Sequence, residues 1–523
     1  MKIIGPFIGR LSPNSVRIWL HSIDGFPEAP LKVLLNGTDR PAIAMDHAKF
    51  RDYLIAIVDI DKLDRGRTYS FTVLSGDTPL AAGVPPEQLV FRTLPLKEEG
   101  DWSFVVMSCH NPLSYEKKHR GKGWRVWEAM PDILWGKNNA NVRFGILGGD
   151  QVYNDEKETD LEKALTAEER RRELVDNYRD YWQPEVYQSV MRRLPAFMMW
   201  DDHDIYDGWG SFNVQEYSRE GKVKWGEIFD SAKGAFNAFQ ASRNPAPLLE
   251  GDNFTCAFSH DGIGFLLLDL RTHRNKDEKR IWSQQQKESV YKWLETDAAK
   301  LDHLFIVSPV TLFHLSPELE EIIKGGLTGF AWFKAWFLGL FGRRPPPQPK
   351  DPKKDMNDDL IDSWGSSINQ PAMLEFAERV YKWQNAAPAS TGQPRSAIVL
   401  TGDIHLGGYT EFVSTRAEHE RQPYLVQVIS SPVAYEPQPA LVGKAQSALL
   451  NPYAFKHEKA QWLTVQHRFL LPQRNFCVIN VEQTEGKYRQ FRVKFYREDF
   501  SEPQQVVIPP FPAPLERLQW DAL

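Results

Sequence analysis

The sequence predicts an α/β protein in which an N-terminal β-sandwich is followed by a layered domain of buried strands and helices. Two patterns support this prediction. Up to about residue 96, short apolar runs are separated by turn residues such as Asn36-Gly37 and Ser75-Gly76, which is typical of a sandwich. Beyond the charged stretch at 97–100, the apolar runs become continuous and alternate with long amphipathic stretches, as in strands buried between helices.

The N-terminal segment contains several strand-like runs. They are SVRIWL, LKVLL, YLIAIV, TYSFTV and LVFRT. Leu63 and Tyr69 resemble the corner of fibronectin type III-like domains, in which a tyrosine hydroxyl bonds to upstream backbone. We therefore expect a fibronectin III/Ig-like sandwich over residues 1–96.

Uninterrupted apolar runs mark the strands of the layered domain. They are FVVM (104–107), VRFGIL (142–147), AFMMW (196–200), GFLLLD (264–269), LFIVS (304–308), AIVL (397–400) and YLVQVI (424–429). Helices are expected between them at 168–182, 283–297 and 372–383, and Ser283 with Gln286 has capping-box spacing. This alternation indicates a sheet covered by helices.

The domain limits follow from the same patterns. We expect the layered domain over 97–470, with an aromatic insertion at 325–355. The runs NFCVINVE and KYRQFRVKFYRE predict a closing hairpin, so that residues 471–523 form a hairpin and a Pro-rich tail packing on the layered domain.

Composition limits the possible functions and compartments. Lys plus Arg number 63 and Asp plus Glu 69, a net charge of −6, so no overall basic field is available to hold a nucleic acid. Cys109, Cys256 and Cys477 are odd in number and far apart, which suits a reducing compartment. The sequence shows neither a signal-peptide pattern nor a run of roughly 18 apolar residues, and we expect a cytoplasmic protein.

Residues that can bind metals follow the predicted strands. The segments are Ser108-Cys109-His110, Gly149-Asp150-Gln151-Val152-Tyr153, Asp201-Asp202-His203-Asp204, Asp269-Leu270-Arg271 and Asp403-Ile404-His405. Ligands gather beyond the carboxyl ends of strands in α/β sheets, so these segments are expected to meet. A single Asp there is usually a turn or cap residue, but several converging carboxylates would repel one another unless cations neutralised them. The pattern therefore predicts a site for two metal ions.

The types of donor suggest which ions would bind. Asp150, Asp202 and Asp403 offer hard oxygen ligands, whereas a thiolate, a phenolate and an imidazole suit a transition metal such as iron. The candidate metal ligands are Cys109, Asp150, Tyr153, Asp202, Asp403 and His405. His203 is a candidate proton donor, and Arg271 could form two parallel hydrogen bonds to an anionic group.

Taken together, these motifs resemble those of the PhoD-like (alkaline phosphatase D) metallophosphatases. The matching motifs are SCH at 108–110, GDQVY at 149–153, WDDHD at 200–204, LDLRTHR at 268–274 and GDIH at 402–405. The resemblance covers about residues 100–440 and extends to the preceding sandwich. It implies a metallophosphatase-type αββα domain and a phosphodiesterase or alkaline phosphatase that hydrolyses phosphate esters by attack of a metal-bound hydroxide at a two-metal site.

The resemblance also implies roles for single residues. Asp150 would bridge two metal ions, with Cys109 and Tyr153 on Fe(III). His405, Asp403 and Asp202 would complete the pair, whose second ion would be Ca(II) or another divalent cation. His203, paired with Asp204, would lie over the leaving group, while His110 and Arg271 would contact the substrate.

An aromatic segment at 325–342, flanked by basic residues, is a departure from this family pattern. It could lie in a membrane interface, or pack on the catalytic domain as a helix or lid. The alternative function is therefore a membrane-surface phospholipid- or phosphate-binding protein on a degenerate metallophosphatase fold. An iron-dependent redox enzyme ranks last, because no cofactor motif accompanies the Cys and Tyr ligands. The physiological substrate and the oligomeric state stay open.

Overall fold

The computed structural model describes most of the chain. The described residues are 2–80, 83–136, 141–157, 161, 163–211, 225–314, 362–386, 395–438, 452–455, 460–484, 488–499 and 502–508. The aromatic insertion predicted at 325–355 and the Pro-rich end at 509–523 lie outside them. Among the described helices, none is both long and apolar enough to cross a membrane.

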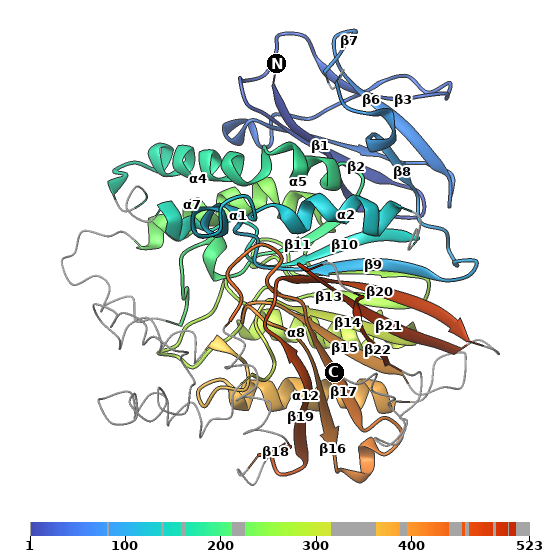
Figure 1. The fold of residues 1–523 in the computed structure, drawn as a ribbon, viewed down its shortest axis with the longest axis vertical. Coiled ribbons are helices and arrows are strands. Elements are labelled where there is room, and N and C mark those ends of the chain that lie inside the picture. Colours follow the sequence, from blue (N-terminus) through green and yellow to red (C-terminus); the bar gives the residue numbers. More distant parts are fainter. Residues whose placement is uncertain are drawn as a thin grey trace.

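Two antiparallel sheets form the N-terminal unit, drawn in blue in Figure 1. One contains β1 (Ile3–Leu11), β2 (Val16–Ser22) and β5 (Ile55–Ile60); the other contains β4 (Ile43–Ala44), β3 (Leu31–Leu35), β6 (Thr68–Ser75), β7 (Thr78–Pro79) and β8 (Val90–Arg92). Buried residues such as Ile18, Val33 and Phe71 fill the space between them. The Tyr69 hydroxyl accepts a hydrogen bond from the Asp64 amide at 2.8 Å, which confirms the tyrosine corner.

Two larger sheets form the second part of the fold. The six-stranded sheet has the order β11 (Ala196–Met199), β10 (Val142–Gly148), β9 (Trp102–Met107), β20 (Asn475–Thr484), β21 (Tyr488–Arg497) and β22 (Gln504–Ile508). The eight-stranded sheet has the order β12 (Cys256–His260), β13 (Ile263–Leu267), β14 (His303–Ser308), β15 (Ser396–Thr401), β17 (Tyr424–Ile429), β16 (Gly407–Ser414), β19 (Leu463–Leu471) and β18 (Tyr453–Ala454). All the apolar runs predicted as strands are strands.

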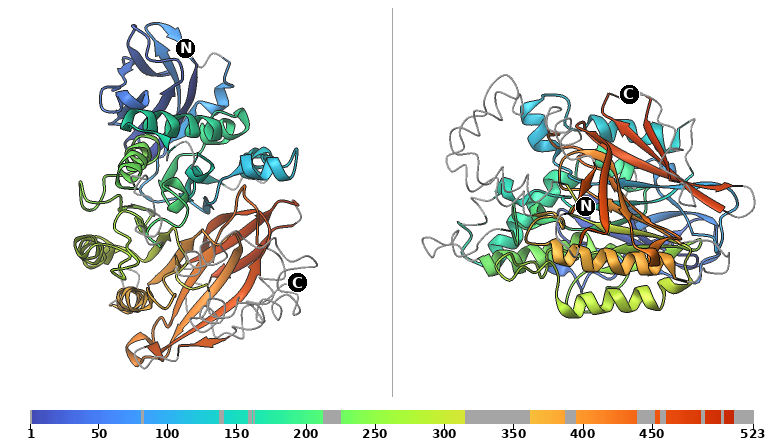
Figure 2. Two further views of the ribbon diagram at one scale, coloured as in Figure 1. Left: turned by 90° about the vertical axis from the view of Figure 1, so that its left-hand side faces the viewer. Right: turned by 90° about the horizontal axis from the view of Figure 1, so that it is seen from below.

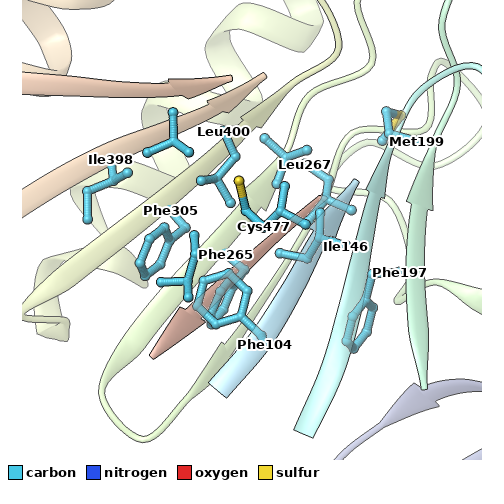
Figure 3. Packing of buried hydrophobic residues seen from close by; sticks show 14 of the residues in the cluster. Phe104, Ile146, Phe197, Met199, Phe265, Leu267, Phe305, Ile398, Leu400 and Cys477 are labelled. Carbon is cyan, nitrogen blue, oxygen red and sulfur yellow. The ribbon is translucent and has the colours of Figure 1, made fainter. Parts of the chain in front are cut away.

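The C-terminal hairpin is part of the six-stranded sheet. Strand β20 pairs antiparallel with β9, one of the strands that lead into the predicted site. The inner faces of the two sheets pack on each other through aromatic and aliphatic side chains, including Phe104, Phe265, Phe305 and Leu400 (Figure 3).

Helices cover the outer faces of both sheets. Those on the six-stranded sheet are α1 (Pro112–Lys118), α2 (Arg125–Trp135), α4 (Ala167–Trp182) and α5 (Glu185–Met191), with α7 (Trp225–Phe239) packed on α4. Those on the eight-stranded sheet are α8 (Gln284–Glu295) and α12 (Gln370–Asn385), which lie side by side in Figure 2. Short 3-10 turns occur at Arg51–Tyr53, Pro86–Gln88, Asn154–Lys157, Asp202–Asp204, Ala241–Arg243, Ala298–Lys300 and Ala417–His419. The result is the predicted helix–sheet–sheet–helix layering.

Two of the predicted helices begin with side-chain caps. The hydroxyl of Thr166 caps α4, and the Glu169 carboxylate accepts a hydrogen bond from the backbone amide of Thr166. Together these two bonds form a capping box. At α8, the Ser283 hydroxyl accepts from the Gln286 amide at 3.0 Å. The Gln286 side chain instead donates to the carbonyl of Asp269 at 2.6 Å, so it ties the helix to the loop after β13.

The sandwich packs on the layered domain through its three-stranded sheet. Phe7 and Trp19 belong to the same buried cluster as Trp182 of α4, and Trp19 Nε1 donates to the carbonyl of Ala238 at 3.1 Å. The buried guanidinium of Arg243 lies over the Phe7 ring at 5.2 Å and donates to the carbonyl of Ile8 at 3.2 Å. These contacts hold the two parts together with buried apolar surface.

Candidate metal centre

The loops after β9, β10, β11 and β15 bring most of the predicted metal ligands together. Three sets of residues offer ligand atoms that lie within 4.8 Å of one another. The sets are Cys109, Asp150 and His405; Asp150, Asp202 and His203; and Asp201, Asp202 and Asp403. Asp150 and Asp202 each belong to two sets, so the sets form one continuous centre.

The backbone at this centre is unusual. Cys109, Asp150, Asp403 and His405 all have positive φ, between 52° and 69°. Residues other than glycine rarely adopt this left-handed conformation, and such strained residues cluster at functional sites. Gly149, at φ +114°, has no alternative, because an added Cβ would lie 2.7 Å from the Cβ of Asp201. These turns therefore direct four of the predicted ligands towards the centre, and they do so at a cost in backbone energy.

Asp150 lies at the middle of the centre and has incomplete partners. Its Oδ2 accepts from the Cys109 thiol and from the Tyr153 hydroxyl, both at 3.4 Å. Its Oδ1 is buried and has no hydrogen-bond partner in the described part of the chain. A buried polar atom without a partner is costly, and a cation would satisfy it.

Burial opposes ionisation of these side chains. It raises the pKa of Asp150 well above its usual range, with further contributions from Asp201, Asp202 and Asp204 that the charge of His203 opposes. Burial also raises the pKa values of Cys109 and Tyr153, and the Asp150 carboxylate adds to both shifts. Metal ligands must be deprotonated, so a bound cation would reverse these shifts. The donor set therefore fits metal ions better than it fits an apolar interior.

Aromatic rings line one side of the centre. Tyr435 stacks on Tyr153 with centroids 5.0 Å apart and an interplanar angle of 6°, and it lies 4.3 Å from the His405 ring. Tyr435 follows β17, in a loop whose Ser431 hydroxyl donates to Cys109 Sγ at 3.0 Å. Sequence reasoning missed this residue, although the run YLVQVI is followed by polar and aromatic residues as the other strands are.

Comparison with known proteins finds a family resemblance over part of the chain. The sequence model of the PhoD-like phosphatase family matches residues 104–301, which include Cys109, Asp150, Asp202 and Arg271. This part of the chain, less than half of its length, is similar to the PhoD-like phosphatase family. No curated protein matches the chain.

Solved structures support the PhoD-like fold. The structure described as that of PhoD superposes with a TM-score of 0.60 at 12% identity, and the match covers 97% of this chain and 90% of the other. Purple acid phosphatase PPD1 from yellow lupin (Lupinus luteus) seeds has a TM-score of 0.50 at 11% identity, covering 97% of this chain and 74% of the other. These likenesses confirm the predicted fold class.

The guanidinium of Arg271 is bound by other groups of the protein. Its side chain is fully buried and all five N–H donors have acceptors. The guanidinium donates to Asp201, to Asp202 at 3.2 Å, to both carboxylate oxygens of Asp362 at 2.5 and 3.0 Å, and to the carbonyl of Trp209 at 3.0 Å. The fork of Arg271 already holds Asp362, and the predicted contact of Arg271 with substrate stays a prediction.

His110 also has a structural environment. Its ring is fully buried, stacks on Tyr187 at 5.1 Å, and accepts a hydrogen bond from Trp127 Nε1 at 3.1 Å. Burial lowers the pKa of His110 to about 3, so the imidazole is neutral. The side chain packs among the aromatic residues of α2 and α5, and its predicted contact with substrate stays a prediction.

The pairing predicted for His203 needs correction. Its Nδ1 lies 2.9 Å from Asp155 Oδ1, in the loop after β10, and not on Asp204. The Asp204 carboxylate instead accepts from the amides of Asp150 and Asp201 at 2.8 and 2.9 Å, and from Gln240 at 2.8 Å. Asp204 thus holds the ligand loops in place, and Asp155 orients His203.

Another possible metal-binding group lies apart, on α12 and the turn at Ala417–His419. It consists of Glu378, Glu418 and His419. Arg416 forms ion pairs with both glutamates, so this group already has a cation. It carries no functional assignment.

Proposed function

We propose that this chain is a metal-dependent phosphoesterase of the phosphodiesterase or alkaline phosphatase type. The observation that supports it best is Asp150, which is shared between two sets of candidate ligands and has a buried oxygen without a donor. The match of residues 104–301 to the PhoD-like phosphatase family supports phosphate esters as the substrate class.

The donor set divides into two halves. Cys109, Tyr153 and His405 would hold Fe(III) together with Asp150, because thiolate, phenolate and imidazole suit a transition metal. Asp202 and Asp403 would hold Ca(II) or another divalent cation, again with Asp150, because hard cations prefer carboxylate oxygens. When bound, such ions supply Lewis-acid activation of water and of phosphoryl oxygens.

His203 is placed to donate a proton to the leaving oxygen. Burial lowers the pKa of His203, but the carboxylates of Asp155, Asp202 and Asp150 together raise it well above its ordinary value, which favours the protonated ring. Asp155 holds Nδ1, which leaves Nε2 for the reaction, with Asp207 Oδ1 at 3.8 Å. His203 also lies within the ligand set of Asp150 and Asp202, so the two roles need an experiment to separate them.

The first experiment is hydrolysis of bis-p-nitrophenyl phosphate by Asp150→Asn. We expect a rate loss on the order of 10²–10³-fold, because the variant removes the shared ligand. Asp261→Asn is the matched control: Asp261 is also buried, but it pairs with Arg489 at 2.7 Å, away from the ligand loops. Native activity in Asp150→Asn, or an equal loss in both variants, would refute the proposed function.

We also propose that the protein works in a reducing compartment such as the cytoplasm. All three cysteines are buried and unpaired, which supports this placement. Fractionation of cells that express the native chain tests it, and recovery in an oxidising compartment would contradict it.

A further inference from the structure

We propose that Asp362 is a positioning residue for the candidate metal ligand Asp202, acting through the guanidinium of Arg271. This proposal rests on the metal centre of the proposed function. It goes beyond that centre because neither Asp362 nor Arg271 is itself in a candidate ligand set.

The geometry of Arg271 is fixed mainly by Asp362. The two carboxylate oxygens of Asp362 accept from Nη1 at 3.0 Å and from Nη2 at 2.5 Å. A bidentate pair of this kind fixes the plane of the guanidinium as well as its distance. With the plane fixed, the second Nη2 hydrogen points to Asp202 Oδ1 at 3.2 Å, and Nε points to Asp201.

Asp202 is therefore held from both sides. Its Oδ1 accepts from Arg271, and its Oδ2 accepts from the Gly208 amide at 2.7 Å. Each carboxylate oxygen has two lone pairs, so one on each oxygen stays available for a cation. Outer partners that orient metal ligands in this way typically contribute about 10–100-fold to metal affinity or activity.

Charge balance gives Asp362 a second effect. The carboxylates of Asp201, Asp202 and Asp362 face the guanidinium groups of Arg271 and Arg274, so the cluster has one more negative than positive charge. All of these side chains are buried, so water screens them little. Neutralising Asp362 would leave Arg271 to interact mainly with Asp201 and Asp202, and Asp202 would then attract a metal ion less strongly.

The same side chain has other partners that hold it in place. Ser211 donates to Asp362, and Arg274 lies 3.0 Å from Asp362 Oδ1 and donates to the Asp362 carbonyl at 2.5 Å. The isosteric variant Asp362→Asn keeps the shape of the site. It removes the charge and replaces one acceptor with a donor that faces Arg271.

The test measures metal binding directly. Chelator-treated native protein, Asp362→Asn and Glu98→Gln are titrated calorimetrically with Ca²⁺ and, in parallel, with Mn²⁺. Glu98→Gln is the matched control, since Glu98 also forms a buried pair with an arginine, Arg143, at 2.6 Å but lies outside the ligand sets. We expect affinity for the divalent ion to fall about 10–100-fold in Asp362→Asn and to stay native in Glu98→Gln.

A second readout separates positioning from a merely structural role. In Asp362→Asn, raising the divalent ion concentration should restore kcat towards the native value, which it cannot do for a misfolded protein. Native metal affinity in Asp362→Asn, or an equal affinity loss in Glu98→Gln, would overturn the proposal. If native protein binds the ions but hydrolyses no phosphate ester, the proposed function fails while the positioning role of Asp362 stands.

Discussion

Glu98 and Asp150 are both buried carboxylates, but their surroundings differ. Glu98 accepts from Arg143 through both oxygens at 2.6 Å and lies 2.9 Å from the His260 ring. These partners outweigh the effect of burial and lower the pKa of Glu98 to about 2. Asp150 has thiol and hydroxyl neighbours and other carboxylates, and its pKa is raised by burial.

The difference shows where a cation from outside would complete the surroundings of a carboxylate. At Glu98 the protein supplies its own positive charges, so the carboxylate stabilises the fold. At Asp150 no arginine or lysine reaches the free oxygen among the described residues, and Cys109, Asp403 and His405 of the same centre have strained backbone. Strained residues of this kind cluster at functional sites, and metal-dependent chemistry is the use that fits these donors.

Substitution of His203 should have the largest effect on the hydrolysis rate. Its charged ring is paired with the Asp155 carboxylate and faces the site. In His203→Gln, hydrolysis of esters with alkyl leaving groups should fall about 10²–10⁴-fold, while p-nitrophenyl esters should be much less affected. A nitrophenolate leaves without a proton, whereas an alkoxide needs one. Rate measurements on the two ester types test this prediction.

Metal analysis of His203→Gln serves as the control for that experiment. Unchanged metal content with a loss specific to alkyl esters supports the proton donor. An equal loss on both ester types together with lost metal would assign His203 as a ligand instead.

Glu98 provides the opposite test, with an effect on stability rather than on chemistry. Breaking a buried ion pair typically costs about 3–5 kcal/mol, because it leaves an uncompensated charge. Glu98→Gln should therefore lower the free energy of unfolding by this amount while keeping native kcat. Chemical denaturation checks it, and unchanged stability would contradict the contrast with Asp150.

The pH dependence of stability gives a smaller effect. Burial lowers the pKa of His303 to about 3, with a contribution from Arg489, so folded His303 stays neutral below pH 6.5 while the unfolded state takes up a proton. The folded pKa is below the unfolded one, so stability falls as pH decreases from 6.5 towards 3. Between pH 6.5 and 5 this single group should remove up to about 2 kcal/mol. Glu98 adds to the loss below pH 4.5, since its folded pKa is about 2.

His303→Gln isolates this contribution. Native protein and variant should show different slopes of unfolding free energy against pH between 6.5 and 5, with the variant flatter. Parallel curves would show that His303 does not resist protonation in the folded state.

The smallest effect concerns the sandwich. Tyr69→Phe removes the hydroxyl that accepts from the Asp64 amide and should lower stability by about 1 kcal/mol. The candidate metal centre lies in another part of the fold, so activity should stay native. Thermal unfolding with an activity assay checks both statements, and a loss of activity in the folded variant would contradict them.

Much of the fold was predictable from local pattern. Continuous apolar runs such as 142–147 and 304–308 are strands because they are buried on both faces, and helices such as α4 begin at a side-chain cap. The position of candidate ligands was predictable for the same reason, since parallel strands end at a common edge.

The partners of those ligands were not predictable, because they come from distant parts of the chain. Arg271 pairs with Asp362, 91 residues away, and His203 pairs with Asp155, 48 residues away. His110 directly follows the candidate ligand Cys109. The backbone is left-handed at Cys109, and the His110 ring after it packs against α2 and α5. Local sequence shows which residue types end a strand, but tertiary packing decides which of them reach the site.

The most direct test of the metal centre is the metal content of the purified native chain and of Asp150→Asn, measured by elemental analysis after incubation with iron and calcium. We expect two ions per native chain, and in the folded variant the loss of both ions or of all but weakly held metal. Native protein without bound metal, or a variant that retains two ions, would contradict it.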